Sequence, residues 1–138
     1  MSSFMFFSFD QTMAWDGYSF YSNSTALKIQ LLDPSFFVGS VPTTAKNTYS
    51  DISQMSAYLL SGTDKSLTNV ATSAAADSSS IILISDDYNL YPSSVTTQGA
   101  VVYDANNFLI CVIDFGSTQN TVSGTFNIPL SKGIIRIR

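Results

Sequence analysis

The stretch QGAVVYDANNFLICVIDFG, residues 98–116, decides the fold of this chain. Two apolar runs rich in β-branched and aromatic residues flank the turn-forming residues 104–107, and this pattern predicts a β-hairpin. Nearly every residue of both runs is apolar, whereas a strand with one wet face alternates, so both faces of the hairpin are predicted to be covered. The hairpin is therefore expected in the middle of a packed β-structure.

The segments before the hairpin predict one clear strand and one helical turn. Residues 26–32 alternate strictly between apolar and polar side chains, which predicts a strand with one buried face. Asp33-Pro34 ends this strand, because proline cannot donate to a strand ladder and restricts the residue before it. Residues 48–55 predict a single helical turn with Ser50 or Asp51 as its cap.

The segments after the hairpin continue the β-pattern. Residues 117–122 predict a polar turn, and residues 124–129 alternate again, with Phe126 and Ile128 facing inward. Residues 134–137 predict a last strand. The spacing of strands and turn signals predicts an all-β fold, an antiparallel β-sandwich or jelly-roll-like barrel of about eight or nine short strands.

Length and patterning predict one domain with an N-terminal extension. The chain has 138 residues, which is the size of a single domain able to bury its own core. Residues 1–24 mix aromatic side chains with Ser, Asn and Gly without a period, and they predict an aromatic-rich arm. Residues 25–138 are predicted to form the single β-sandwich domain. The aromatic arm is expected to pack on its own domain or on another subunit, since so many aromatic side chains are not left in water.

Composition excludes several kinds of chemistry. The chain has no histidine, which excludes imidazole acid–base catalysis, Ser-His and Cys-His nucleophiles and zinc sites of His and Cys. The net charge of −4 and the scattered Lys and Arg argue against nucleic acid as a partner. No apolar run reaches the length that spans a membrane. No glycine-rich phosphate loop is present, so no cofactor is predicted.

Aspartate is the remaining candidate for catalysis. Asp86, Asp87 and Asp114 are the candidates for a carboxylate pair that cleaves a glycosidic bond. The favoured interpretation is structural, because Asp caps loops by accepting hydrogen bonds from downstream amides. On this interpretation Asp114 belongs to a turn that ends at Gly116. The sequence therefore predicts that the protein is not an enzyme.

Two binding functions are weaker alternatives. Asp104, Asn106 and Asn107 offer oxygen ligands for calcium, but they fit no EF-hand pattern, and a hairpin turn is the simpler explanation of the same residues; no metal site is predicted. Exposed aromatic residues can stack on sugars, which makes a carbohydrate-binding adsorption module the alternative from another class of function. The candidate stacking residues are Trp15, Tyr18, Tyr21 and Tyr88. The single cysteine, Cys111, is predicted to be a small buried hydrophobic residue.

Several segments of the chain, in order, resemble a family of small bacteriophage virion structural proteins. The resemblance extends from the strand around Leu27 towards the C-terminus, and the block from Pro92 to Ile135 is its specific part. The segments that carry it are ALKIQLLD (residues 26–33), YSDIS (49–53), LSGT (60–63), PSSVTTQGAVVY (92–103), IDFG (113–116), SGTFNI (123–128) and GI (133–134).

This resemblance implies a capsid decoration (cement) protein, located in the virion on the capsid surface and made in the host cytoplasm. Such a protein binds the outer head surface and stabilises the capsid by bridging subunits of the major capsid protein, and it is expected to be a trimer. A neck, tail or head-fibre structural subunit is the alternative within the same setting. The expected subunit contacts are Phe4, Phe6, Phe7, Phe9 and Trp15 in the arm, together with Arg136 and Arg138 at the C-terminus.

Overall fold

The computed structural model describes residues 2–5, 27–37, 49–74 and 81–137. These residues form an all-β structure with three short 3-10 segments and no α-helix among the described residues. The strands are β1 (Ser2–Met5), β2 (Lys28–Leu32), β3 (Lys65–Ser66), β4 (Ala71–Ala74), β5 (Ile81–Ile84), β6 (Tyr88–Tyr103), β7 (Leu109–Ile128) and β8 (Ile135–Ile137). The 3-10 segments are η2 (Pro34–Phe37), η3 (Ile52–Met55) and η4 (Leu130–Lys132).

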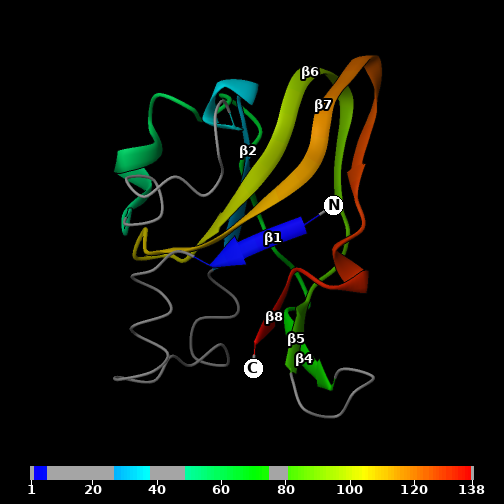
Figure 1. Cartoon of the computed structure of the whole chain (residues 1–138). Coiled ribbons are helices and arrows are strands. Elements are labelled where there is room, and N and C mark those ends of the chain that lie inside the picture. Colours follow the sequence, from blue (N-terminus) through cyan, green and yellow to red (C-terminus); the bar gives the residue numbers. More distant parts are fainter. Residues whose placement is uncertain (1, 6–26, 38–48, 75–80, 138) are drawn as a thin grey trace.

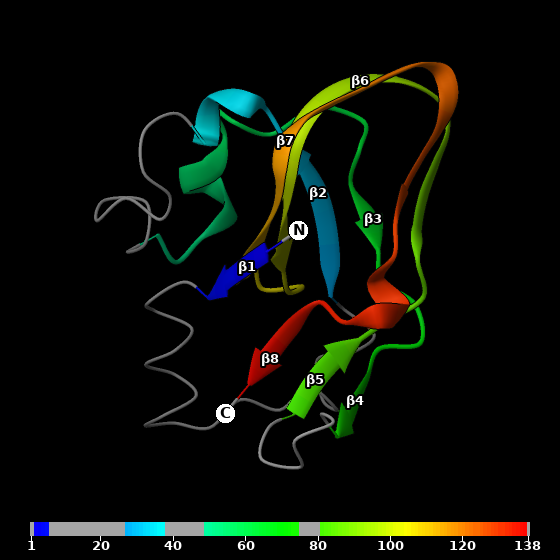
Figure 2. The same cartoon turned by 45° about the vertical axis from the view of Figure 1, so that its right-hand side comes forward.

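The strands form two antiparallel sheets. The larger sheet has the order β1-β7-β6-β2-β3, and the smaller sheet has the order β4-β5-β8. The larger sheet curves into a nearly closed, barrel-like form (Figures 1 and 2). The first residue of β6 approaches the β3 edge of this sheet, where the Tyr88 hydroxyl donates to the carbonyl oxygen of Thr63, two residues before β3, at 2.6 Å. The all-β prediction is therefore confirmed.

The predicted hairpin is confirmed as the centre of the larger sheet. β6 and β7 pair antiparallel, with Val102 opposite Cys111 and Val101 opposite Val112. Asp104 organises the turn, because one of its carboxylate oxygens accepts from the backbone N–H groups of Asn106 at 2.9 Å and Phe108 at 3.0 Å. Asp104, which the sequence offered as a calcium ligand, therefore closes this turn.

The hairpin is much longer than expected and bends into an arch. β6 has 16 residues and β7 has 20, so the expectation of short strands is wrong here. We call residues 99–103 and 109–115 the proximal limb and residues 88–97 and 119–128 the distal limb. Figures 1 and 2 show β7 rising along the proximal limb, passing over the top and descending along the distal limb, with β6 beside it in the opposite direction.

The predicted turn at residues 117–122 is wrong, because this segment lies inside β7. The pairing of β6 with β7 continues there, with Val95 opposite Thr121 and Thr97 opposite Gln119. Register shifts, together with backbone φ angles of 84° at Gly116 and 52° at Ser123, bend the ladder. A polar stretch that we interpreted as the end of a strand is instead the point where a continuous strand bends.

Apolar side chains cover both faces of the proximal limb, as the sequence predicted. One face looks into the arch, where Ala100, Val102 and Ile113 pack with the residues of β2. The other face bears Val101 and Val112, which pack in a second cluster with residues of η2 and η3. Figure 1 shows these two segments beside the proximal limb and β2.

β2 and η3 follow the local signals in the sequence. Leu27, just before β2, and Ile29 and Leu31 within it are fully buried in the arch, which confirms the predicted alternation. Asp51 caps η3, because its carboxylate accepts from the backbone N–H of Ser53 at 2.9 Å. This bond lowers the pKa of Asp51, and the predicted helical turn is a capped 3-10 segment.

Candidate functional site

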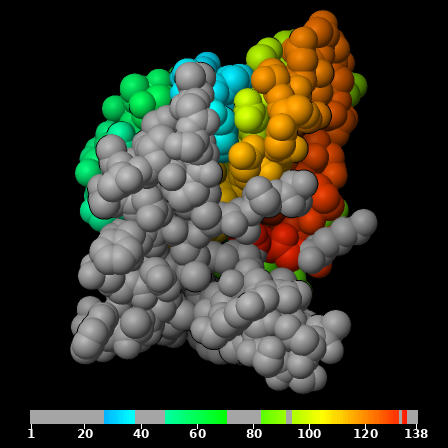
Figure 3. Space-filling model, in the orientation of Figure 1, coloured from blue at the N-terminus to red at the C-terminus, as the bar shows by residue number. Residues whose placement is uncertain are grey.

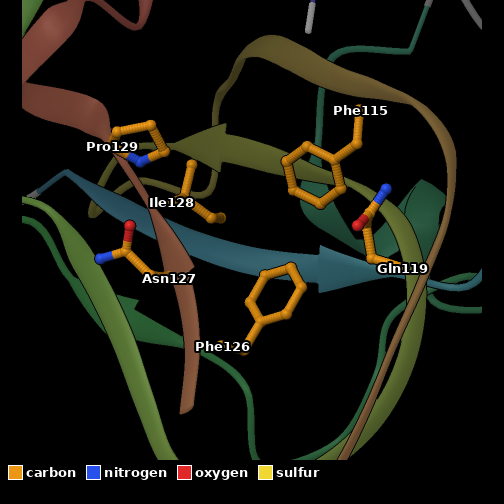
Figure 4. Close-up of a pocket in the computed structure, with 6 residues that line it drawn as sticks. All are labelled: Phe115, Gln119, Phe126, Asn127, Ile128 and Pro129. Atoms are coloured by element: carbon orange, nitrogen blue, oxygen red, sulfur yellow. The ribbon is translucent and has the colours of Figure 1, made fainter.

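A pocket of about 180 Å³ lies inside the arch, where the proximal and distal limbs of β7 face each other. Phe115 of the proximal limb and Phe126 of the distal limb line it, with ring centroids 5.8 Å apart and planes tilted by 52°. Its other lining residues are Gln119, Asn127, Ile128 and Pro129. Figure 4 shows the two rings turned towards the same space. The pocket is thus largely apolar and carries no charged side chain among these lining residues.

Gln119 supplies the oriented polar group of the pocket. Its side-chain nitrogen donates to the backbone oxygen of Ser117 at 3.3 Å and to the Ser117 hydroxyl oxygen at 3.1 Å. These two bonds fix which end of the amide carries the nitrogen. Within the part of the chain that the structure describes, no group donates to the Gln119 carbonyl oxygen Oε1. Gln119 is exposed, so this oxygen is open to solvent.

Asn127 contributes differently from Gln119. Its side-chain nitrogen donates to Asn89 Oδ1 on the neighbouring strand β6 at 2.6 Å. Asn127 lies between Phe126 and Ile128, which face inward, so its side chain belongs to the opposite face of the strand. Figure 4 likewise shows this amide turned away from the two phenyl rings. Asn127 therefore stiffens the distal limb and does not supply a side-chain donor to the pocket.

The sequence pointed to part of this pocket but not to its assembly. It predicted that Phe126 and Ile128 face inward, and both are buried, which confirms that expectation. The sequence did not indicate that Phe115 lies beside these residues, because residues 117–122 look like a turn and do not reveal that β7 continues through them and bends. Gln119 was missed for the same reason. The local sign of this bend in the sequence is the glycine directly after Phe115, since Gly116 has a positive φ.

The structure describes the backbone of two predicted contact residues. Phe4 lies in β1, opposite Val112 of β7, so the start of the arm adds a strand to the edge of the large sheet. Arg136 lies in β8, opposite Ile82 of β5. The other predicted contacts, Phe6, Phe7, Phe9, Trp15 and Arg138, lie outside the described residues.

The three candidate catalytic aspartates all accept hydrogen bonds within the fold, Asp114 from a near neighbour in the sequence and Asp86 and Asp87 from distant residues. Asp86 accepts from the Thr68 hydroxyl at 2.9 Å and from the Asn69 amide at 2.7 Å. Asp87 accepts from the backbone N–H of Ser131 at 2.9 Å. Asp114 accepts from the backbone N–H of Gly116 at 2.8 Å, which confirms the predicted cap. Each carboxylate holds a loop or a bend in place.

Tyr88 is not an exposed stacking residue, so that expectation is wrong. Its side chain is only 3% exposed, and its hydroxyl donates to Thr63 as described above. Burial, with a smaller contribution from the charge of Asp64, raises the pKa of Tyr88 to about 12. The Lys65 ammonium lies 5.3 Å from the centroid of its ring. The other candidate stacking residues, Trp15, Tyr18 and Tyr21, lie outside the described residues.

We expect the protein to lose stability as the pH rises from about 10 towards 12. The unfolded Tyr88 phenol ionises near its ordinary pKa of about 10, whereas the folded one stays neutral to about 12. The unfolded state therefore loses its proton first, so the free energy of unfolding falls across this interval. Urea unfolding at pH 9 and pH 11.5 measures the loss. Tyr88→Phe should reduce the loss and Tyr91→Phe, on an exposed ring, should not; equal losses in all three proteins would contradict this account.

Cys111 is fully buried, as the sequence predicted. Burial raises the pKa of its thiol to about 12, so the thiolate is scarce at neutral pH. The side chain packs with the residues inside the arch. Cys111 therefore acts as a small core residue and not as a nucleophile.

No family model, no curated protein and no solved structure matches this chain. Among the described residues, no three His, Cys, Asp or Glu side chains gather as ligands for a metal ion. The same residues contain no helix with the length and apolar character needed to cross a membrane.

Proposed function

We propose that this protein is a bacteriophage capsid decoration protein that binds the outer head surface and bridges subunits of the major capsid protein. The proposal rests on the resemblance of the block from Pro92 to Ile135 to the family of small bacteriophage virion structural proteins, and the arched β6–β7 hairpin, whose proximal limb is covered on both faces, supports a structural role. Only 12% of the residues are charged, so flat contacts with neighbouring subunits desolvate few ions. The three candidate catalytic carboxylates accept hydrogen bonds that hold loops and a strand bend in place, which favours a structural role over a catalytic one.

The proposed partners are the major capsid protein and further copies of this chain, as a trimer. Many equivalent contacts on a symmetric shell convert weak individual contacts into tight total binding. The proposed location is the virion surface after synthesis in the host cytoplasm. The finer fold proposal is a β-sandwich or jelly-roll-like barrel in which the two limbs of the arch stand for the two facing sheets.

The contacts proposed for binding are the aromatic residues of the arm and the two C-terminal arginines. β1 pairs with β7, so deleting the N-terminus would also remove a strand of the large sheet. A sharper variant keeps residues 1–5 and replaces Phe6, Phe7, Phe9 and Trp15 with serine. Because buried aromatic anchors dominate interfaces, we expect this variant to bind purified heads at least about tenfold more weakly than the wild type.

Sedimentation of purified heads that lack the protein, after mixing with each variant, measures the occupancy. The matched control is Val122→Ala, which removes an exposed apolar side chain outside the proposed contacts. Replacing Arg136 and Arg138 with glutamine tests the C-terminal contact separately. Full occupancy by the serine variant would refute the role of the arm, and failure of the wild-type protein to bind heads would refute decoration itself.

A further inference from the structure

We propose that copies of this chain exchange strand β1, so that residues 2–5 of one copy pair with β7 of the next copy. β1 is the outermost strand of the larger sheet, where it lies along β7 from Cys111 to Asp114. Figures 1 and 2 show it beside the proximal limb. Exchange deepens the proposed function, because it rests on the self-association proposed there and names the surface that joins the copies.

The edge of β7 beside β1 needs a strand from some source. Residues 109–113 of β7 are all buried and belong to the central hairpin. Without β1, the backbone groups that point outward from residues 111–114 would be unpaired, and a bare apolar edge is a template for pairing with another chain. β1 covers this edge in antiparallel register. The identical strand of a second copy makes the same residue pairs, so exchange costs no ladder contact.

The connection between β1 and β2 is far longer than pairing within one copy requires. Met5 lies opposite Cys111, which lies opposite Val102 of β6. Val102 in turn lies opposite Ile29 of β2. At about 4.8 Å per strand, these three steps place Met5 about 14 Å from Ile29. Residues 6–26 of the connection can span about 70 Å when extended, so its length does not tie β1 to its own copy.

The same connection reaches a neighbouring copy. A folded chain of 138 residues is roughly 40 Å across, so the matching β7 edge of a touching copy lies within reach. The sequence directly after β1, FFSF at residues 6–9, carries aromatic contacts already proposed for binding. Exchange brings this sequence to a boundary between copies, where burial of aromatic area offsets the entropy lost on association. In a trimer each copy gives β1 to the next and receives one, which closes the ring.

A disulfide between β1 and β7 tests the exchange in the purified full-length protein, without heads. Met5→Cys places a thiol opposite the natural Cys111, and the Cα atoms of antiparallel partners lie at a separation that a disulfide can bridge. After oxidation with copper phenanthroline, exchange in a trimer joins each copy to the next. We therefore expect covalent trimers on a non-reducing gel. Met5→Cys combined with Cys111→Ala is the matched control and should give no covalent trimer.

A second pair of cysteines makes the test independent of the buried position of Cys111. Ser2→Cys with Asp114→Cys, in the Cys111→Ala chain, joins the other end of the same ladder. Opposite pairs alternate between two spacings along an antiparallel ladder, and the two variants sample one of each. Disulfides that form only within single copies would overturn the proposal. Failure of both variants to form any disulfide would also overturn it, because β1 would then not pair with β7.

Light scattering of the wild type and of a chain without residues 1–5 gives an independent measurement. We expect the wild type to be a trimer and the shortened chain to form trimers at least about tenfold more weakly, because the exchanged strand is lost. A monomeric wild type, or a shortened chain that trimerises equally well, would overturn exchange. Head binding is measured separately. A trimer joined through β1 that ignores heads refutes decoration alone, and a monomer that binds heads refutes exchange alone.

Discussion

Replacing Phe36 with alanine is expected to lower the free energy of unfolding by about 3–5 kcal/mol. Phe36 is fully buried in η2, and its ring makes edge contacts with Phe37 at 5.0 Å and Tyr58 at 5.3 Å between centroids. It belongs to the cluster that covers the outer face of the proximal limb. Its removal leaves a cavity against the central hairpin, which the neighbouring strands cannot close without losing their register.

Urea unfolding followed by circular dichroism measures this loss. Tyr91→Ala is the matched control, because it also truncates an aromatic ring but on the exposed surface, and we expect a change within about 0.5 kcal/mol. A loss below about 1 kcal/mol for Phe36→Ala would show that η2 does not cover the sheet in solution.

Replacing Gly99 with alanine is expected to cost about 3 kcal/mol. A methyl group at this position would collide with the backbone oxygen of Ile113 and with the ring of Phe37. Gly99 lies where β6 bends between its two limbs, beside the register shift that follows Thr97. The backbone oxygen cannot turn away as a flexible side chain could, so the hairpin itself must shift.

Two other glycines provide controls for the Gly99 prediction. Gly124 has no contact closer than 3.9 Å at the corresponding position, so Gly124→Ala should be nearly neutral. Gly116 has open space but a φ of 84°, so Gly116→Ala should cost about 1 kcal/mol through backbone strain alone. Thermal unfolding of the three variants ranks them; a neutral Gly99→Ala would contradict the close packing of the arch against η2.

The elements that the sequence predicted well are those with purely local causes. The central hairpin follows from two apolar runs around a turn, and its Asp104 closes that turn through its own carboxylate. Residues 26–32 alternate, and the alternate leucines and isoleucine are buried as expected. Asp51 caps the only helical turn that the pattern indicated. In each case the signal lies within a few residues of the structure that it specifies.

The parts that the sequence did not predict depend on contacts between distant residues. Residues 117–122 are polar and turn-like, yet residues 119–121 pair with residues 95–97 of β6 and continue the ladder. The sequence predicts no element directly after Pro34, yet Phe36 and Phe37 cover one face of the sheet. Tyr88 carries no local sign of burial; it is buried because β3 and the distal limb meet around it. Sequence periodicity reports a buried face but not the partner that buries it.

In the candidate site, too, local signals were predictable and contacts between distant residues were not. Phe126 and Ile128 were expected to face inward, but the pocket exists only because the arch brings Phe115 opposite them. The space-filling view shows the upper end of this arch as a corner of the molecule (Figure 3). The proposed contacts of the arm at Phe6, Phe7, Phe9 and Trp15 stay predictions.

The most direct test of the proposed decoration role is the number of copies of this protein in each purified virion, measured by quantitative mass spectrometry against the major capsid protein. A decoration protein occupies equivalent positions over the whole shell, so we expect on the order of hundreds of copies in a fixed ratio to the capsid protein. A count of about a dozen or fewer would contradict decoration and assign the chain to a neck, tail or fibre. Absence from the virion would contradict both structural roles.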